Sequence, residues 1–320
     1  MRLGNRDRSK ISAARDYSVG GICRPGLSGP ANVRPAVSYY FDMKYALLAL
    51  ALTLAACGTH AAPLPAFFDN GDTPLAFTLD LPDRKPPFPA VVLGHGSGRV
   101  TRDQLTWASR HFTDLGYAVL RFDKRGVGES SGTFVFVGTK DSPRVFPQLA
   151  SDVAAGVRFL RTRPEIDHDR IGLFGASQAG WILPLAAREA GGVAFVILWS
   201  GPVCSVGQEM FYSDIVENTG RPVGDGNGAM SRFHGAPGFD PLPTLRALDS
   251  PSLWLLGLDD HSIPVQTTLE NLRTLKAAGR RVEWRTYDGL DHQLSPGVWD
   301  DVARWLGTPT FSAPIPSKQQ

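Results

Sequence analysis

The chain has 320 residues, of which 42% are hydrophobic and 20% charged, a composition that excludes a disordered or fibrous protein and fits a soluble globular one. The net charge of +2 comes from the N-terminus, since residues 1–56 hold eight of the 33 basic and three of the 31 acidic side chains. The remaining 25 basic and 28 acidic side chains give a net charge of −3 and suggest no basic face, so we expect no nucleic-acid partner.

The N-terminal region contains a candidate export signal. Residues 1–42 are rich in Arg, Gly, Pro and Ser and lack apolar periodicity, so we interpret them as a disordered leader and Met43 as the true translation start. A lysine and an apolar run follow Met43, and this pattern predicts a secretory signal peptide over residues 43–56. The run has about 11 residues, whereas a membrane-spanning helix needs roughly 20.

The end of this signal, Leu54-Ala-Ala-Cys57, resembles the lipobox of bacterial lipoproteins. The resemblance implies that Cys57 is lipidated and becomes the new N-terminus. We therefore expect an exported lipoprotein whose lipid anchor holds it to a membrane of the cell envelope, facing the periplasm. Residues 57–66 would be a tether and residues 311–320 a disordered tail. The alternative is a buried helix with a chance cysteine.

Short apolar strands and helices alternate through residues 67–310. The expected strands cover residues 75–81, 90–93, 117–122, 171–174, 193–199, 252–256 and 282–287, and the expected helices residues 103–115, 149–161, 178–190, 265–278 and 297–306. Buried strands that alternate with helices predict a mostly parallel sheet covered on both faces. This part of the chain is thus one α/β domain.

An insertion over residues 201–243 interrupts the alternation and is longer than a usual connection. It contains one predicted helix, residues 208–218, and a glycine-rich stretch. We interpret it as a small lid over the carboxyl edge of the sheet. A loosely ordered surface loop is the alternative.

Residues 171–180 predict a strand that runs through a sharp turn into a helix, with Ser177 at the turn. Such a turn pushes the serine hydroxyl out of the sheet toward a base. It also requires small residues two positions before and after the serine, and Gly175 and Ala179 meet this requirement. Glycine is commoner at the second position, so Ala179 is a mild departure. The pattern makes Ser177 a candidate nucleophile.

Two further loops follow predicted strands and would lie near Ser177, because ligands of open α/β sheets bind at the carboxyl ends of the strands. Gly94-His95-Gly96-Ser97-Gly98 follows the strand 90–93, and we expect the backbone N–H groups of Ser97 and Gln178 to form an oxyanion hole. We expect His95 to brace this loop. The loop 123–132 is either a turn whose charges tie adjacent loops together or a rim of the pocket.

Candidates for an orienting acid and a base follow the last two predicted strands. Asp259 and Asp260 follow the strand 252–256, and the spacing of Asp260 from Gly257 and Pro264 favours it as the acid, with Asp259 as the alternative. Either aspartate could instead cap the next helix. His292 follows the last strand and is the candidate base, because the order serine, acid, histidine matches that of this fold.

Taken together, residues 67–306 resemble the α/β-hydrolase superfamily, nearest to dienelactone-hydrolase-like and prolyl-oligopeptidase-like esterases. The resemblance rests on the motifs His95–Gly98, Asp123–Gly126, Gly175–Gly180, Gly257–Pro264 and Asp291–His292. It implies an α/β-hydrolase fold with Ser177 as the nucleophile, Asp260 as the orienting acid and His292 as the base and then the acid.

The predicted function is hydrolysis of small-molecule carboxylic esters through an acyl-enzyme. We expect no cofactor and no metal, since no His, Cys and carboxylate cluster has ligand spacing and no glycine-rich loop ends in Lys-Ser or Lys-Thr. Peptide hydrolysis and acyl transfer to an acceptor other than water are alternatives on the same fold. A non-catalytic envelope binding protein is an alternative of another class. The sequence leaves the acyl group, the alcohol and the oligomeric state open.

Overall fold

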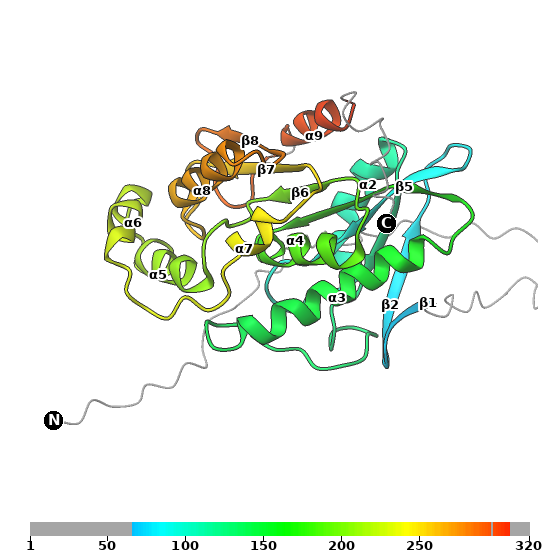
Figure 1. Cartoon of the computed structure of the whole chain (residues 1–320), viewed down its shortest axis with the longest axis horizontal. Coiled ribbons are helices and arrows are strands. Elements are labelled where there is room, and N and C mark those ends of the chain that lie inside the picture. Colours follow the sequence, from blue (N-terminus) through cyan, green and yellow to red (C-terminus); the bar gives the residue numbers. More distant parts are fainter. Residues whose placement is uncertain (1–65, 296, 308–320) are drawn as a thin grey trace, which may run out of the picture. The chain divides into compact units, whose positions relative to one another are not determined.

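Eight strands form one mixed sheet in the residues that the computed structural model describes, 66–307 apart from residue 296 (Figure 1). The strands are β1 Ala66–Asn70, β2 Thr73–Asp80, β3 Phe88–Leu93, β4 Ala118–Phe122, β5 Ile166–Ala176, β6 Val196–Trp199, β7 Ser252–Gly257 and β8 Val282–Tyr287. Their order is β1-β2-β4-β3-β5-β6-β7-β8. The pairs β1–β2 and β2–β4 are antiparallel and the others are parallel. The predicted α/β-hydrolase fold is confirmed.

Helices cover both faces of the sheet. The described helices are α2 Thr106–Asp114, α3 Ser142–Leu160, α4 Ala179–Ala190, α5 Val206–Val216, α6 Val223–Ala229, α7 Leu242–Arg246, α8 Val265–Ala277 and α9 Val298–Leu306, with 3-10 turns η1 Arg102–Leu105 and η2 Met230–Arg232. Ala90 and Val92 of β3 belong to one apolar core cluster with residues of α3, α4 and α8, whereas Val91 and Leu93 belong to a second cluster with residues of α2 and α9. This alternation gives the sheet two apolar faces. None of the helices described is long and apolar enough to cross a membrane.

The antiparallel edge of the sheet begins one strand earlier than predicted. β1 and β2 form a hairpin in which Asn70 pairs with Thr73, and Gly71 in the turn has a φ of 59°. The interpretation of residues 57–66 as a tether is therefore wrong at Ala66, which begins β1. Phe68 holds β1 to the core, where its ring lies 5.4 Å from that of Phe122.

Two helical regions also differ from the prediction. Helix α3 begins at Ser142 rather than at residue 149. Pro147 inside this helix cannot donate a backbone hydrogen bond, and the burial of Val145 and Phe146 offsets that loss. The insertion 201–243 contains α5, α6 and η2 and the first residues of α7, where one helix was expected. Ser205 and Gln208 form a capping box that begins α5.

Helix α5 contacts the loop that follows β7. The hydroxyl of buried Tyr212 donates a hydrogen bond to the backbone oxygen of Asp260, at 2.8 Å. The insertion therefore supports one of the loops that carry candidate site residues. The predicted leader, signal peptide, Cys57 and C-terminal tail lie outside the described residues, as does the rest of the tether.

Candidate active site

Ser177 lies in a strained turn between β5 and α4. Its φ is 57°, a left-handed conformation that is uncommon for a residue with a side chain. The turn is held by its own backbone, because Ser177 N–H donates to Trp199 O at 2.9 Å and Gly180 N–H donates to Ser177 O at 2.8 Å. Strain of this kind persists where the surrounding structure enforces it, and it is concentrated at functional sites.

The small residues around Ser177 are required by close packing. A Cβ atom on Gly175 would lie 2.6 Å from the Cβ atom of Ala179, and a Cβ on Gly180 would lie 2.8 Å from Pro202 Cδ. Ala179 is itself fully buried. The methyl group of Ala179 is therefore accommodated because residue 175 is glycine.

Asp260 and His292 lie in hydrogen-bond contact. The Nδ1 atom of His292 donates to Oδ2 of Asp260 at 2.8 Å, and Asp260 is fully buried. The other oxygen, Oδ1, accepts from the backbone N–H groups of Ser262 and Ile263 at 2.8 and 3.0 Å. Asp259 is exposed. Of the two candidate aspartates, the fold thus brings Asp260 to the histidine.

Side chains at the end of β6 hold the backbone of the loop that carries His292. Ser200, with a φ of 48°, donates from its hydroxyl to His292 O at 2.9 Å, and Trp199 Nε1 donates to Gln293 O at 3.2 Å. Asp291 is exposed, and its carboxylate accepts from Gln293 N–H instead of facing the imidazole. The loop conformation therefore directs His292, and not its acidic neighbour, into the site.

The charge state of His292 reflects two opposing effects. Burial of the ring lowers its pKa, but the hydrogen bond and charge of Asp260, together with the charges of Glu217 and Glu209, outweigh this effect. The pKa of His292 is therefore raised above its usual value. A carboxylate that faces Nδ1 also keeps the proton on that nitrogen and leaves Nε2 as the acceptor.

The two predicted oxyanion-hole residues flank Ser177. Gln178 follows it directly, and the loop of Ser97 lies close, since a Cβ atom on Gly96 would be 3.8 Å from Ser177 Cβ. The backbone N–H groups of Ser97 and Gln178 donate to no acceptor within the described part of the chain. Both donors are thus available to a ligand.

Two buried side chains below the oxyanion loop have structural contacts. His95 Nε2 lies 2.7 Å from Phe122 O, and burial lowers the pKa of His95 to about 3, so this ring is neutral. Lys124 Nζ donates to Gly96 O at 2.8 Å and to Gln178 Oε1 at 2.9 Å. Sequence reasoning assigned the loop 123–132 only a general role and missed these contacts of Lys124.

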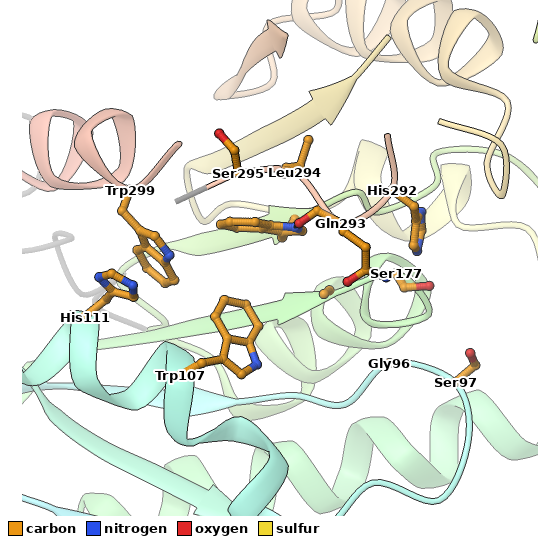
Figure 2. Close-up of a pocket in the computed structure, with 12 residues that line it drawn as sticks. Gly96, Ser97, Trp107, His111, Ser177, His292, Gln293, Leu294, Ser295 and Trp299 are labelled. Carbon is orange, nitrogen blue, oxygen red and sulfur yellow. The ribbon is translucent and has the colours of Figure 1, made fainter. Parts of the chain in front are cut away.

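A cavity of about 570 Å³ opens beside Ser177 and His292, with Ser97 on its wall (Figure 2). Its opposite end is aromatic and is formed by Trp107, Trp199, Trp299 and His111, whose ring stacks on that of Trp299 at 4.4 Å. Figure 2 shows Ser177 and His292 together at one end and Trp107, His111 and Trp299 at the other. The site can therefore accept an apolar or aromatic group next to the serine hydroxyl.

The sheet, the strained serine turn and the cavity at the carboxyl ends of the strands define an α/β hydrolase. A model of the prolyl oligopeptidase family, peptidase family S9, matches residues 103–305. The chain therefore belongs to the prolyl oligopeptidase family.

Individual relatives include proteins with esterase names. The chain is 32% identical to the quorum-quenching protein AidA of Acinetobacter baumannii over 132 residues, 40% of each chain. It is 24% identical to esterase EstD of Thermotoga maritima over 275 residues, 71% of this chain and 64% of the relative. Both matches cover less than two thirds of the relative's length. A Pyrococcus furiosus esterase structure superposes with a TM-score of 0.58 at 20% identity, over 76% of this chain and 89% of that one.

Proposed function

We propose that this hydrolase cleaves carboxylic esters of small molecules through an acyl-enzyme on Ser177. The observation that supports this most directly is the hydrogen bond from His292 Nδ1 to buried Asp260, beside a cavity that both His292 and Ser177 line. An imidazole oriented in this way has its Nε2 free to accept the proton of a hydroxyl group.

In the first step the Oγ atom of Ser177 attacks the ester carbonyl carbon while His292 Nε2 takes the hydroxyl proton. Asp260 stabilises the imidazolium that forms. The N–H groups of Ser97 and Gln178 bind the negative oxygen of the tetrahedral intermediate. The bond from carbon to the alcohol oxygen then breaks, and His292 gives its proton to the departing alcohol.

In the second step a water molecule attacks the acyl-enzyme. His292 removes a proton from this water and later returns a proton to Ser177 Oγ as the carbon–serine bond breaks. The acid is released and the enzyme regains its starting protonation. No cofactor takes part in either proposed step.

Covalent labelling tests the nucleophile. We expect a fluorophosphonate probe to label the purified protein and to fail with Ser177→Ala, whereas Ser205→Ala, which lacks only a helix-capping hydroxyl, keeps the label. No labelling of the native protein would instead support a non-catalytic binding protein. Labelling that persists in Ser177→Ala would disprove the role of Ser177.

A substrate panel tests the reaction. Membership of a peptidase family makes peptide hydrolysis the second candidate. We expect p-nitrophenyl esters to be cleaved with a higher kcat/KM than peptide p-nitroanilides. The reverse order would favour the peptidase, and product formation that depends on an added alcohol or amine would favour an acyltransferase.

The proposed location is the cell envelope, with Cys57 lipidated after removal of the signal peptide 43–56. Growth of the native host with an alkyne-tagged fatty acid should label the protein, and Cys57→Ser should abolish the label. Recovery of peptides from residues 1–42 by mass spectrometry would contradict Met43 as the start.

A further inference from the structure

A second, smaller hollow of about 120 Å³ also opens at Ser177. It shares Ser97 and Ser177 with the larger cavity, and Gln178 lies on its wall. His292 and the three tryptophans line the larger cavity only. A carbonyl group held between Ser177 and the oxyanion hole thus has room for one substituent in each hollow.

The wall of the smaller hollow away from Ser177 is largely apolar and carries a single carboxyl group. Phe146 and Trp181, whose rings stack 5.3 Å apart, lie on its wall with Met210 and Ile263. Glu209 enters this lining from α5. In pockets of this kind the few polar groups decide which ligand is held.

The side chain of Glu209 has no hydrogen bond or ion pair with the described residues. Glu217, which ends the same helix, accepts from the hydroxyls of Ser213 and Ser262 at 3.0 and 3.1 Å. Glu209 is half-buried, and a carboxylate that is partly withdrawn from water without a partner is destabilised. Glu209 is therefore a group that a ligand can pair with.

The charges around Glu209 favour a cationic partner. Burial raises the pKa of Glu209 to about 8; His292 opposes this shift, and Glu217, Asp260 and Asp214 add to it. Ionisation of Glu209 is therefore less favourable in the empty hollow than in water. A cation that enters the hollow favours the ionised form, and the neighbouring carboxylates attract it further.

We propose that the smaller hollow binds a compact cationic group on the acyl half of the substrate, of the size of trimethylammonium, with Glu209 as its counter-ion. This inference rests on the proposed ester hydrolysis. Trp181 and Phe146 supply aromatic walls of the kind that recognise quaternary ammonium groups. At about 30 Å³ per water, the volume suits a group of roughly four or five heavy atoms.

The position of His292 assigns the two halves of the ester. This residue protonates the departing alcohol in the proposed mechanism, and it lines the larger cavity but not the smaller hollow. The alcohol half therefore occupies the aromatic cavity. The cationic end of the acyl half occupies the hollow of Glu209.

Two esters of equal shape test the proposal. p-Nitrophenyl 4-(trimethylammonio)butanoate carries the cation, and p-nitrophenyl 5,5-dimethylhexanoate replaces its nitrogen with carbon. We expect the wild-type enzyme to prefer the cationic ester in kcat/KM. Glu209→Gln should reduce this preference by about 10-fold or more, because loss of one partner of a buried charge pair costs at least that much.

Glu270→Gln is the control, since it removes an exposed carboxylate from α8 that lines neither cavity. We expect it to keep the preference. In the wild type, tetramethylammonium should inhibit hydrolysis of the cationic ester competitively. A second pair, acetylthiocholine and S-(3,3-dimethylbutyl) thioacetate, carries the cation in the leaving group and should show no dependence on Glu209.

Three outcomes would overturn the inference: no wild-type preference for the cationic acyl ester, a preference that survives in Glu209→Gln, or a Glu209-dependent preference only in the thiocholine pair. Hydrolysis of the uncharged ester with any of these outcomes leaves the proposed function intact. If no ester is hydrolysed and Ser177 is not labelled, the proposed function itself fails.

Discussion

Lys124 Nζ donates to Gln178 Oε1 at 2.9 Å and links the loop after β4 to the residue that follows the candidate nucleophile. The same ammonium group donates to Gly96 O at 2.8 Å and to Gly98 O at 3.3 Å. Those two carbonyls flank Ser97, whose N–H is the other proposed oxyanion donor. One buried cation therefore holds both sides of the oxyanion hole in place.

Replacement of Lys124 should slow the chemical step. We expect Lys124→Met, which keeps the length of the side chain, to lower kcat for a neutral ester by about 10- to 100-fold with little change in KM, because small displacements of catalytic groups are costly. Lys276→Met is the control, since Lys276 lies over the Trp284 ring and lines neither cavity at Ser177. Steady-state kinetics measure both constants. An unchanged kcat would show that Lys124 does not position the oxyanion hole.

The same lysine should limit activity at high pH. Burial lowers the pKa of Lys124 to about 8. Above that pH the neutral amine has two N–H donors for three acceptors, so one contact is lost and the oxyanion loop loosens. We expect kcat to decline through pH 8 to 9 and this decline to be absent from the residual activity of Lys124→Met. A profile that stays flat to pH 10 in the wild type would contradict the assignment.

Asp260 and Asp259 provide a matched pair for testing the orienting acid. Asp260→Asn keeps the shape of the side chain but lets the amide donate to His292 Nδ1, which favours the wrong tautomer and should lower kcat by about 10⁴-fold. Asp259→Asn changes an exposed neighbour and should leave kcat within about twofold. Comparable losses of kcat in both variants would show that activity depends on the loop as a whole and not on the contact of Asp260 with His292.

The acid side of the pH profile should respond to Glu217. As the proposed base, His292 must be neutral in the free enzyme, so kcat/KM rises with pH through its pKa. Glu217 is one of the charges that raise this pKa. Glu217→Gln should therefore lower it and move the rising limb toward lower pH. A rising limb that stays in place or moves to higher pH would contradict the predicted sign.

The parts of the fold that sequence predicted best are those encoded by local patterns. Strand β8 matches its predicted limits, residues 282–287, because most of its residues, Val-Glu-Trp-Arg-Thr-Tyr, are β-branched or aromatic and favour a strand. β1 was missed because its five residues include a single buried side chain, Phe68. Helix α6 was missed because three of its seven residues are glycine and its position depends on packing against α5.

The candidate site likewise combines features with a local sequence signature and contacts that only the fold creates. The turn around Ser177 has a local signature, because close packing demands small neighbours. The contacts of Lys124 join residues 26, 28 and 54 positions apart, and no local pattern encodes them. Glu209 was missed for a similar reason. It lies in helix α5, and only the fold shows that it shares a hollow with Ser177 and has no side-chain partner among residues 66–307.

The pair Gly175 and Ala179 offers a test of why the serine turn tolerates alanine. Gly175→Ala would put two Cβ atoms 2.6 Å apart in a buried turn, and we expect it to lower the free energy of unfolding by about 1–3 kcal/mol and to displace Ser177. Adding Ala179→Gly removes that clash, but Leu183 Cδ1 and Gly94 O would still lie 3.1 and 3.2 Å from the new methyl group. The double variant should therefore recover part of the stability and of kcat, as measured by urea unfolding and ester hydrolysis. If the two substitutions were simply additive, the close approach of residues 175 and 179 would not be what restricts this turn.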